Sequence, residues 1–420
     1  MGGVSRPVEG AGGNREVPPG DALGGRELPP EEGGSWGKHG FPHGSEPKAS
    51  QPRVIPLSAP WIDGREEELV IEVLRSGRLS LGPMIDRFEA ALAERVGARR
   101  VAAVSSGTAG LHLCVRLAGI GSGDEVVTTP FSFVASSNCL LYEGATPVFA
   151  DVDRDTLNLD PAAVEAAITP RTKAIVAVDI FGYPADLADL EAIAERHGLA
   201  LLEDACQALG ARYRGRPVGS SGRPAVFAFY PNKQMTTGEG GAVAVASEEE
   251  WNLLKSLSNQ GRSDSGEWLT HSRLGYNYRL DDVSAALGLA QLERLDELLD
   301  ARAEVARRYN GLLEDVEGVE APLADDPEHV RSWFVYVVRL ADGIDRNGVI
   351  ARLSEEGVAS KPYLPSIHLQ PYYRERFATR EGLCPVAEDA SARSLALPFH
   401  ARLPAEDGER VVEALTRALR

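Results

Sequence analysis

The pattern of apolar and polar residues predicts two helices followed by an alternation of strands and helices. Glu66 to Leu74 and Met84 to Val96 place apolar residues three and four positions apart, which is typical of amphipathic helices. From Val101 onward, short apolar runs alternate with helical segments such as Leu187 to His197. The predicted strands are Val101 to Val104, Glu125 to Thr128, Thr146 to Phe149, Ala174 to Val178, Ala200 to Leu202, Ala225 to Phe229 and Ala242 to Ala246. Such apolar strands suit an α/β domain in which helices cover both faces of a mainly parallel sheet.

After Asp281 the pattern changes to one long helix and then to a mixture of elements. The helical periodicity runs from Asp281 to about Glu314, with Asp281 or Asp282 as its cap, and predicts a connector between domains. A smaller α+β domain is expected to follow, with a strand at Trp333 to Leu340 and helices at Arg346 to Glu356 and Glu406 to Leu419. We therefore predict a large α/β domain at residues 53–300 and a small C-terminal domain at residues 301–420.

The first 52 residues are rich in glycine and proline and have no aliphatic periodicity. Such a segment cannot bury enough apolar surface to offset the entropy of the chain, so we expect a disordered extension at residues 1–52.

Composition limits the partners of the protein. A net charge of -18 argues against binding to nucleic acid or to an anionic membrane, because both need an excess of lysine and arginine. The sequence has no membrane-length apolar run and no secretion signal. Its four cysteines are widely spaced, which favours neither disulfides nor a metal site. We expect a cytoplasmic protein without bound metal.

One lysine follows an apolar segment that a proline ends. The run from Ala225 to Phe229 stops before Pro231, which cannot continue a ladder of hydrogen bonds, and Lys233 precedes a glycine-rich turn at Gly238 to Gly241. Lys233 is therefore expected on a short loop between two strands. Partial desolvation there favours a neutral amine and suits Schiff-base chemistry. A single lysine in a hairpin loop is more often only a surface residue.

Three other strand ends carry candidate binding groups. Ser105 to Gly110 opens a helix, so its amides and hydroxyls form either an anion site or a simple helix cap. Thr129 to Phe133 offers two aromatic rings that could lie against a planar ligand or pack in the core. Glu203 and Asp204 end a buried strand, where open α/β sheets contact ligands, and alternation directs them to opposite faces.

An anion site, an aromatic ring, an acid and a lysine at separate strand ends together meet the needs of pyridoxal phosphate (PLP). The anion site would hold the phosphate, and the ring would stack on the pyridine. The acid would keep the ring nitrogen protonated, and the lysine would bind the aldehyde. The conjunction predicts a PLP enzyme.

Seven short motifs between Ile55 and the C-terminus strengthen this prediction. They are Ser105-Ser106-Gly107-Thr108-Ala109, Gly123-Asp124-Glu125-Val126, Glu203-Asp204-Ala205, Phe229-Tyr230-Pro231-Asn232-Lys233, Gly238-Glu239-Gly240-Gly241, Gly275-Tyr276-Asn277-Tyr278-Arg279 and Ile367-His368-Leu369-Gln370-Pro371-Tyr372-Tyr373. In these motifs the chain resembles the DegT-type sugar aminotransferases, which are PLP enzymes of fold type I. The resemblance implies a large domain with a mainly parallel mixed sheet flanked by helices, and a smaller C-terminal α+β domain.

The resemblance also implies roles for individual residues. Lys233 would bind PLP and move the proton, Asp204 would pair with the pyridine nitrogen, and Asn277 would reach the phosphate of a partner subunit. This last role implies a homodimer with shared active sites. The remaining cofactor-binding residues would be Gly107 and Thr108 at the phosphate, Phe133 on the ring, Gln207 at the phenolic oxygen, and Asn232. Many relatives have a phosphate-binding serine where this chain has Ala228, and Asn232 is a candidate to compensate.

For the substrate, the resemblance implies a keto sugar on a nucleoside diphosphate and glutamate, or else glutamine, as amino donor. Its candidate ligands are Tyr230, Arg279, Lys361, Tyr363 and His368. Alternatives are a cyclitol or another keto substrate, a non-enzymatic regulator or binding protein of the family, and another fold-type-I enzyme such as an aldolase or desulfurase. A dehydratase branch has histidine in place of the lysine, and the presence of Lys233 argues against it.

Overall fold

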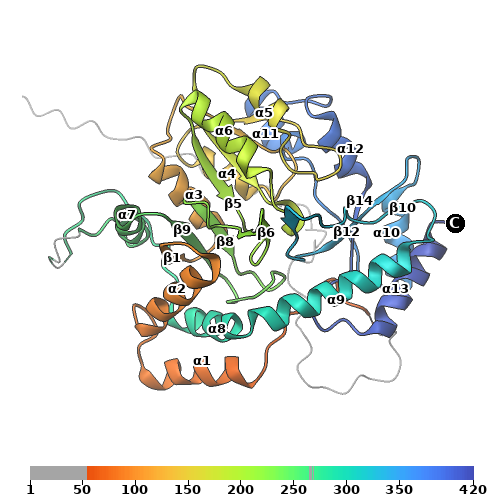
Figure 1. Cartoon of the computed structure of the whole chain (residues 1–420), viewed down its shortest axis with the longest axis horizontal. Helices are drawn as coiled ribbons and strands as arrows, with labels where there is room; N and C mark the ends of the chain where they lie inside the picture. Colours follow the sequence, from red (N-terminus) through yellow and green to blue (C-terminus); the bar gives the residue numbers. More distant parts are fainter. Residues whose placement is uncertain (1–53, 264–266, 268) are drawn as a thin grey trace, which may run out of the picture. The chain divides into compact units, whose positions relative to one another are not determined.

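A mixed sheet of seven strands lies at the centre of the large part of the molecule, in the order β1-β9-β8-β5-β4-β2-β3. Strands β8, β5, β4, β2 and β3 run parallel, whereas β9 is antiparallel to β1 and β8. The computed structural model, which describes residues 54–263, 267 and 269–420, confirms the predicted mainly parallel sheet (Figure 1). The strands are β1 (Arg100–Val104), β2 (Glu125–Thr128), β3 (Thr146–Phe149), β4 (Thr172–Val178), β5 (Ala200–Asp204), β8 (Ala225–Ala228) and β9 (Gly241–Val245). The predicted extension at residues 1–52 lies outside the described residues.

Helices cover both faces of this sheet, as its alternating burial requires. Val104, Val226 and Leu202 point into a core cluster on one face, whereas Phe227 and Leu201 point to clusters on the other. The first face packs against α3 (Gly107–Leu117), α4 (Ala135–Leu141) and α7 (Glu248–Ser258). The second packs against α1 (Gly64–Ser76), α2 (Pro83–Val96), α5 (Pro161–Ala167), α6 (Leu187–His197) and α8 (Asp282–Glu293). Because side chains alternate along a strand, Glu203 and Asp204 face opposite sides.

The predicted continuous helix from Asp281 to Glu314 is two helices. Asp281 caps α8, as predicted, and its side chain accepts a hydrogen bond from the amide of Ser284. The helix ends at Arg294, whose φ of -123° and ψ of 24° are not helical, and α9 (Leu295–Leu313) begins at the next residue. The guanidinium of Arg294 donates 2.8 Å to the carbonyl of Trp61, so a tertiary contact holds the chain at the break. The spacing of apolar residues along the sequence does not show that a single residue between two helices is non-helical.

The C-terminal part is an α+β unit, as predicted, whose sheet has the order β10-β12-β14-β13. Helix α9 leads from beside α8 to α13 in Figure 1, and its residues pack in the core clusters of both parts. The predicted division at residue 300 therefore falls within α9 and stays a prediction. The remaining elements are η1 (Ile180–Gly182), β6 (Arg212–Tyr213), β7 (Arg216–Pro217), β10 (Val319–Glu320), β11 (His329–Val330), β12 (Tyr336–Leu340), α10 (Arg346–Glu355), β13 (Lys361–Pro362), η2 (Ile367–Leu369), α11 (Pro371–Phe377), α12 (Pro385–Arg393), β14 (Ser394–Leu397) and α13 (Ala405–Ala418).

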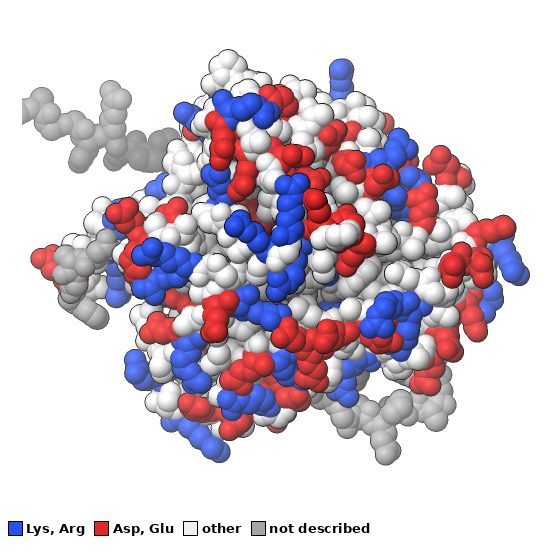
Figure 2. Space-filling view, in the orientation of Figure 1, with Lys and Arg blue, Asp and Glu red and all other residues white. Residues whose placement is uncertain are grey.

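Charged side chains of both signs are interspersed on the face shown in Figure 2. Many charged side chains of the described residues are paired, for example Arg100 with Glu248 at 2.6 Å and Arg214 with Glu328 at 2.8 Å. With a net charge of -18, an anionic ligand must therefore be bound by local geometry. Within the described residues, no helix combines the length and the apolar character that crossing a bilayer requires.

Candidate active site

Lys233 lies in the loop that joins β8 to the antiparallel β9. Backbone hydrogen bonds close this loop, from Phe229 to Gly240 at 3.0 Å and from Lys233 to Tyr230 at 2.9 Å. The side-chain Nζ of Lys233 lies 3.8 Å from the centre of the Phe334 ring. Burial lowers the pKa of Lys233 to about 8, although the nearby Asp204 charge acts in the opposite direction. A substantial fraction of the amine is therefore neutral near pH 8.

Asp204 is the last residue of β5 and is held by two hydrogen bonds. Its Oδ2 accepts from the hydroxyl of Ser136 at 2.6 Å, and its Oδ1 accepts from the amide of Cys206 at 3.2 Å. Ser136 belongs to α4, and its hydroxyl lies 2.8 Å from that of Ser132. Asp204 is thereby fixed beside the 132–136 segment that carries Phe133, with its carboxylate on the same side of the sheet as the start of α3. The sequence analysis did not identify Ser136, which no motif marks.

Glu203 faces the other side of the sheet and is not part of this site. Its carboxyl is buried near that of Asp179, which follows β4, and within the described part of the chain no cation pairs with either. Burial raises the pKa of Glu203 to about 7. Burial and the charges of Glu203 and Asp204 raise the pKa of Asp179 well above its usual range. Asp204 is thus the acid that the fold directs toward Lys233, and its pairing with a pyridine nitrogen stays a prediction.

Because the pKa of Glu203 is raised, we predict that the stability of the protein depends on pH. Its pKa is about 7 in the folded protein and about 4.3 in an unfolded chain, so the folded state binds the extra proton between these values. Stability therefore falls as the pH rises through this window and stays lowered above it. We expect Glu203→Gln to raise the free energy of unfolding at pH 8 by on the order of 1 to 3 kcal/mol, with a smaller gain at pH 5.

Urea unfolding at pH 5 and pH 8 measures this effect, with the exposed Glu67→Gln as the matched control. An equal gain from Glu203→Gln at both pH values would contradict the assignment of the titrating group.

The residues of the predicted anion site lie where β1, β5 and β8 end together. Ser106 caps α3 by accepting a hydrogen bond from the amide of Ala109 at 3.1 Å, so Gly107 and Thr108 form the first turn. A Cβ on Gly107 would lie 2.8 Å from the Cβ of Ala228 and 2.9 Å from the Sγ of Cys206. Only glycine allows the helix to approach the two strand ends so closely, which brings its amide groups to the same place as Asp204 and Lys233.

Ala228 lies beside this anion site, where a serine could have contributed a hydroxyl. Asn232, the predicted substitute, has a buried amide oxygen without a hydrogen-bond partner among the described residues. A buried polar atom of this kind normally has a partner. This oxygen is an acceptor, as phosphate oxygens are, so only the Nδ2 group of Asn232 could donate to a phosphate.

Phe133 and Gln207 occupy different environments near Asp204. The Phe133 ring is 61% exposed, at the edge of a cavity of about 740 Å³ that α4 and residues 364–373 line. Gln207 is buried, and its Oε1 accepts from the amide of Phe181 at 3.0 Å. This bond leaves the Nε2 group as the donor for a phenolic oxygen, the role the resemblance implies.

Asn277 is exposed, and aromatic neighbours hold its segment to the body of the protein. The Nε2 of His112 lies 2.7 Å from a Glu143 oxygen that also accepts from the Tyr276 hydroxyl at 2.8 Å. The Nδ1 of His112 lies 3.1 Å from the Tyr278 hydroxyl. Both neighbours of Asn277 are therefore fixed, and its own side chain faces outward, where a second subunit could receive it.

The predicted substrate ligands are not all brought together. Tyr230 is 52% exposed, and Lys361 is also exposed. The ring centre of Tyr363 lies 6.4 Å from that of Phe334, and burial raises the pKa of Tyr363 to about 12. Arg279 donates 2.9 Å to the side chain of Asn259 and so is engaged by its own loop.

His368 needs a correction, because the structure buries it completely. Its Nε2 lies 2.9 Å from Glu388 of α12, and its ring centre lies 5.9 Å from that of Phe149. A side chain enclosed in this way cannot contact a substrate, so we place His368 among the residues that hold the C-terminal segment together.

These features together fit PLP. A partly neutral lysine, a fixed acid and a helix amino terminus converge at the strand ends. The described residues thus supply a covalent attachment point, a partner for the pyridine nitrogen and donors for a phosphate.

Comparisons with known proteins agree with this geometry. The model of the DegT/DnrJ/EryC1/StrS aminotransferase family matches residues 60–416. The spore coat polysaccharide biosynthesis protein SpsC of Bacillus subtilis (strain 168) is 38% identical over 375 residues, which are 86% of this chain and 96% of that protein.

Solved structures are also similar. S. venezuelae DesV in complex with a ketimine intermediate has a TM-score of 0.82 and 35% identity, over 88% of this chain and 100% of that one. The PLP form of the putative sugar aminotransferase Spr1654 from Streptococcus pneumoniae has a TM-score of 0.83 and 28% identity, over 87% of this chain and 98% of that one.

Proposed function

Because the chain belongs to the DegT/DnrJ/EryC1/StrS aminotransferase family, whose members are PLP-dependent aminotransferases, we propose that it transfers an amino group from glutamate to a keto sugar on a nucleoside diphosphate. The observation that carries this proposal is the convergence of Lys233, Asp204 and the first turn of α3 at one edge of the sheet. PLP, when bound, supplies the electron sink that lets an amino donor lose its Cα proton. All other steps fall to residues of this chain.

Each residue has a distinct task in this proposal. The amine of Lys233 takes the proton and returns it, which its pKa of about 8 favours near neutral pH. The Asp204 carboxylate, oriented by Ser136, keeps the pyridine nitrogen protonated. Gly107 and Thr108 bind the phosphate through backbone amides, with help from Asn232.

The substrate part of the proposal rests on the cavity beside Phe133 and on exposed hydrogen-bond donors of the chain. The cavity of about 740 Å³ next to Phe133 is within the size range of ligand sites, and tyrosine and asparagine side chains line it. Tyr230 and Lys361 are exposed, and Tyr363 lies close to Phe334. Aromatic rings and hydrogen-bond donors suit a sugar. In a chain of net negative charge, the exposed Lys361 supplies a local cation for a diphosphate.

The substrate test separates the two half-reactions. The enzyme is treated with glutamate, its pyridoxamine form is isolated, and keto sugar nucleotides, free keto sugars and keto cyclitols are added separately. We expect the absorbance of the pyridoxal form to return at least tenfold faster with a keto sugar nucleotide than with the other two substrates. Only the intact sugar nucleotide can make all of the interactions that stabilise the transition state.

Return only with a cyclitol or a simple keto acid would reject the nucleotide part and leave the aminotransferase assignment unchanged. If glutamine converts the enzyme to the pyridoxamine form and glutamate does not, the proposal of glutamate as amino donor is wrong.

Because Asn277 is exposed between two fixed tyrosines, we further predict that two subunits share each active site. A twofold dimer lets one chain complete the site of the other. In a mixture of Lys233→Ala chains with Asn277→Ala chains, one site of each hybrid dimer carries both lesions and the other carries none. We expect activity to approach a quarter of the wild-type value when exchange is complete, because half of the dimers are hybrids and each has one intact site.

As a control, Asn259→Ala chains replace the Asn277→Ala chains in the mixture with Lys233→Ala chains, because Asn259 pairs with Arg279 within its own chain. Exchange without recovery of activity would place Asn277 in its own chain's site.

A further inference from the structure

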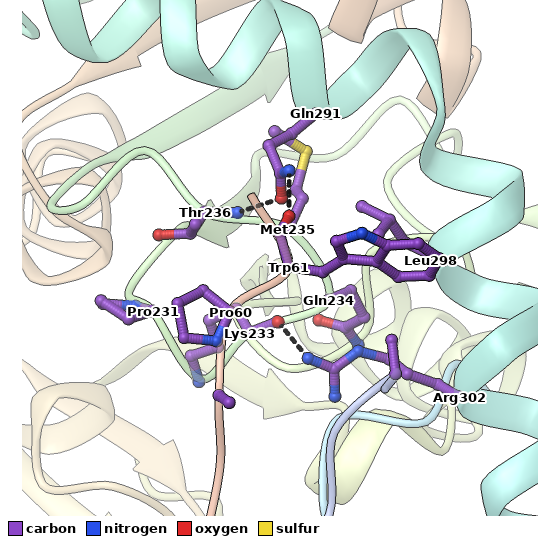
Figure 3. A pocket seen from close by; sticks show the side chains of 12 residues that line it. Pro60, Trp61, Pro231, Lys233, Gln234, Met235, Thr236, Gln291, Leu298 and Arg302 are labelled. Carbon is purple, nitrogen blue, oxygen red and sulfur yellow. Dashed lines mark hydrogen bonds between the residues drawn. The ribbon is translucent and has the colours of Figure 1, made fainter. Parts of the chain in front are cut away.

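A buried arginine of α9 contacts the backbone of the candidate lysine. Arg302 is 3% exposed, and its Nη2 donates 2.6 Å to the carbonyl oxygen of Lys233. Figure 3 shows this contact at the wall of a small void. The other terminal nitrogen, Nη1, donates 3.2 Å to the carbonyl of Phe334. One guanidinium therefore holds two segments that are distant in sequence.

Besides these two carbonyls, the Arg302 guanidinium contacts the Phe399 ring, whose centre lies 5.8 Å from its Cζ. In the part of the chain that the structure describes, no carboxylate lies within ion-pair distance of it, and burial lowers its pKa to about 10. The adjacent void measures about 10 Å³, room for about one water and no ligand. His400 nearby has a pKa lowered by burial and by Arg302 to about 4, so its ring is neutral at neutral pH and adds no second positive charge. A buried cation without a carboxylate partner is costly, so its presence here calls for a function.

The two carbonyls belong to residues whose side chains meet. The Nζ of Lys233 lies 3.8 Å from the centre of the Phe334 ring. Lys233 comes from the loop after β8, and Phe334 from the segment just before β12, so no local structure brings them together. The rigid fork of the guanidinium fixes the distance between the two backbones. A lysine ammonium, whose three donors rotate at the end of a flexible stem, would not fix it.

We propose that Arg302 is a positioning residue that sets where the Lys233 amine lies, by holding the backbones of Lys233 and Phe334 in one geometry. This inference rests on the proposed role of Lys233 as the residue that binds the cofactor and moves the proton. Arg302 itself touches neither cofactor nor substrate. It acts by keeping the amine against the aromatic ring and out of bulk water.

The pKa of the Lys233 amine shows whether the amine is buried or hydrated. The charged or titratable groups that face Lys233 are Asp204 and Cys206 at the end of β5, with Arg302 behind its backbone and Tyr363 beside Phe334. Burial is the largest effect on the amine and lowers its pKa to about 8. Loss of the guanidinium would free the loop and hydrate the amine, so its pKa would rise toward the ordinary value of about 10.4.

The experiment measures the pH dependence of acetylation of Lys233 in the cofactor-free protein, with peptide mass spectrometry to resolve the site. We expect a midpoint near pH 8 in the wild type and a midpoint about one pH unit higher in Arg302→Met. Arg302→Lys should give an intermediate shift of the midpoint, because an ammonium can keep only part of the contact with the two carbonyls. If Arg302→Met does not fold, the Arg302→Lys variant tests the proposal on its own.

Arg308→Met is the matched control, since Arg308 lies on the same helix and donates 2.9 Å to the carbonyl of Leu403. A wild-type midpoint in both Arg302 variants would overturn the inference, and so would an equal shift in Arg308→Met. Borohydride reduction of the PLP-loaded wild type separates the two proposals. A pyridoxyl adduct on Lys233 supports the role of the lysine, whereas an adduct on another lysine rejects that role, and the inference with it, whatever the titration shows.

Discussion

Lys233→Ala should reduce amino transfer by about 10³-fold or more, because it removes both the covalent attachment point and the group that moves the proton. The amine lies against Phe334, with a pKa lowered by burial to about 8. No other lysine of the described residues lies beside the Phe334 ring. The measurement is the single-turnover conversion of bound PLP to its pyridoxamine form with excess amino donor, followed by absorbance.

Lys173→Ala is the matched control, since Lys173 is an exposed lysine of β4 in the same sheet. It should convert PLP at the wild-type rate. A small primary amine such as ethylamine should restore part of the activity of Lys233→Ala, because the truncated side chain leaves room for an amine to act as base. A Lys233→Ala protein that kept more than a tenth of the wild-type rate would show that another group moves the proton.

Much of the large domain could be predicted from the sequence because its buried strands are apolar along their whole length. The differences arise where a residue serves a tertiary contact. The strand predicted at Trp333 begins only at Tyr336, because Phe334 leaves the ladder to meet Lys233. The helix predicted through residue 314 breaks at Arg294, which donates to Trp61. Neither contact changes the local period of apolar residues.

The candidate site divides in the same way. Lys233, Asp204 and Gly107 stand in short motifs, each at the end of a strand, so parallel strands bring them together without further information. Arg302 stands in a helix of ordinary amphipathic pattern, and only the fold places it against the carbonyl of Lys233. His368 stands in a motif but is buried against Glu388, because α12 covers it. A motif identifies a residue as important but does not say whether its side chain faces the ligand or the core.

Asp204→Asn is the second substitution for which we expect a large effect, a fall in turnover of about 10²-fold with the fold and cofactor binding retained. The amide has almost the shape of the carboxylate, so the contact with the Ser136 hydroxyl at 2.6 Å can persist through the amide oxygen. A neutral amide cannot keep the pyridine nitrogen protonated, and PLP then becomes a weaker electron sink. Single-turnover rates, together with the absorbance spectrum of the bound cofactor, measure the change.

Two further variants make this prediction specific. Glu203→Gln is the same chemical change one residue earlier in β5, on the opposite face of the sheet, and should leave turnover within about twofold of wild type. Ser136→Ala removes a bond that orients the acid but keeps the charge, so we expect a loss of about tenfold, the effect of one hydrogen bond to a charged group. If Asp204→Asn were as active as wild type while Glu203→Gln lost most of its turnover, the acid that serves the pyridine nitrogen would be Glu203, and the side of the sheet on which the cofactor binds would have to be reassigned.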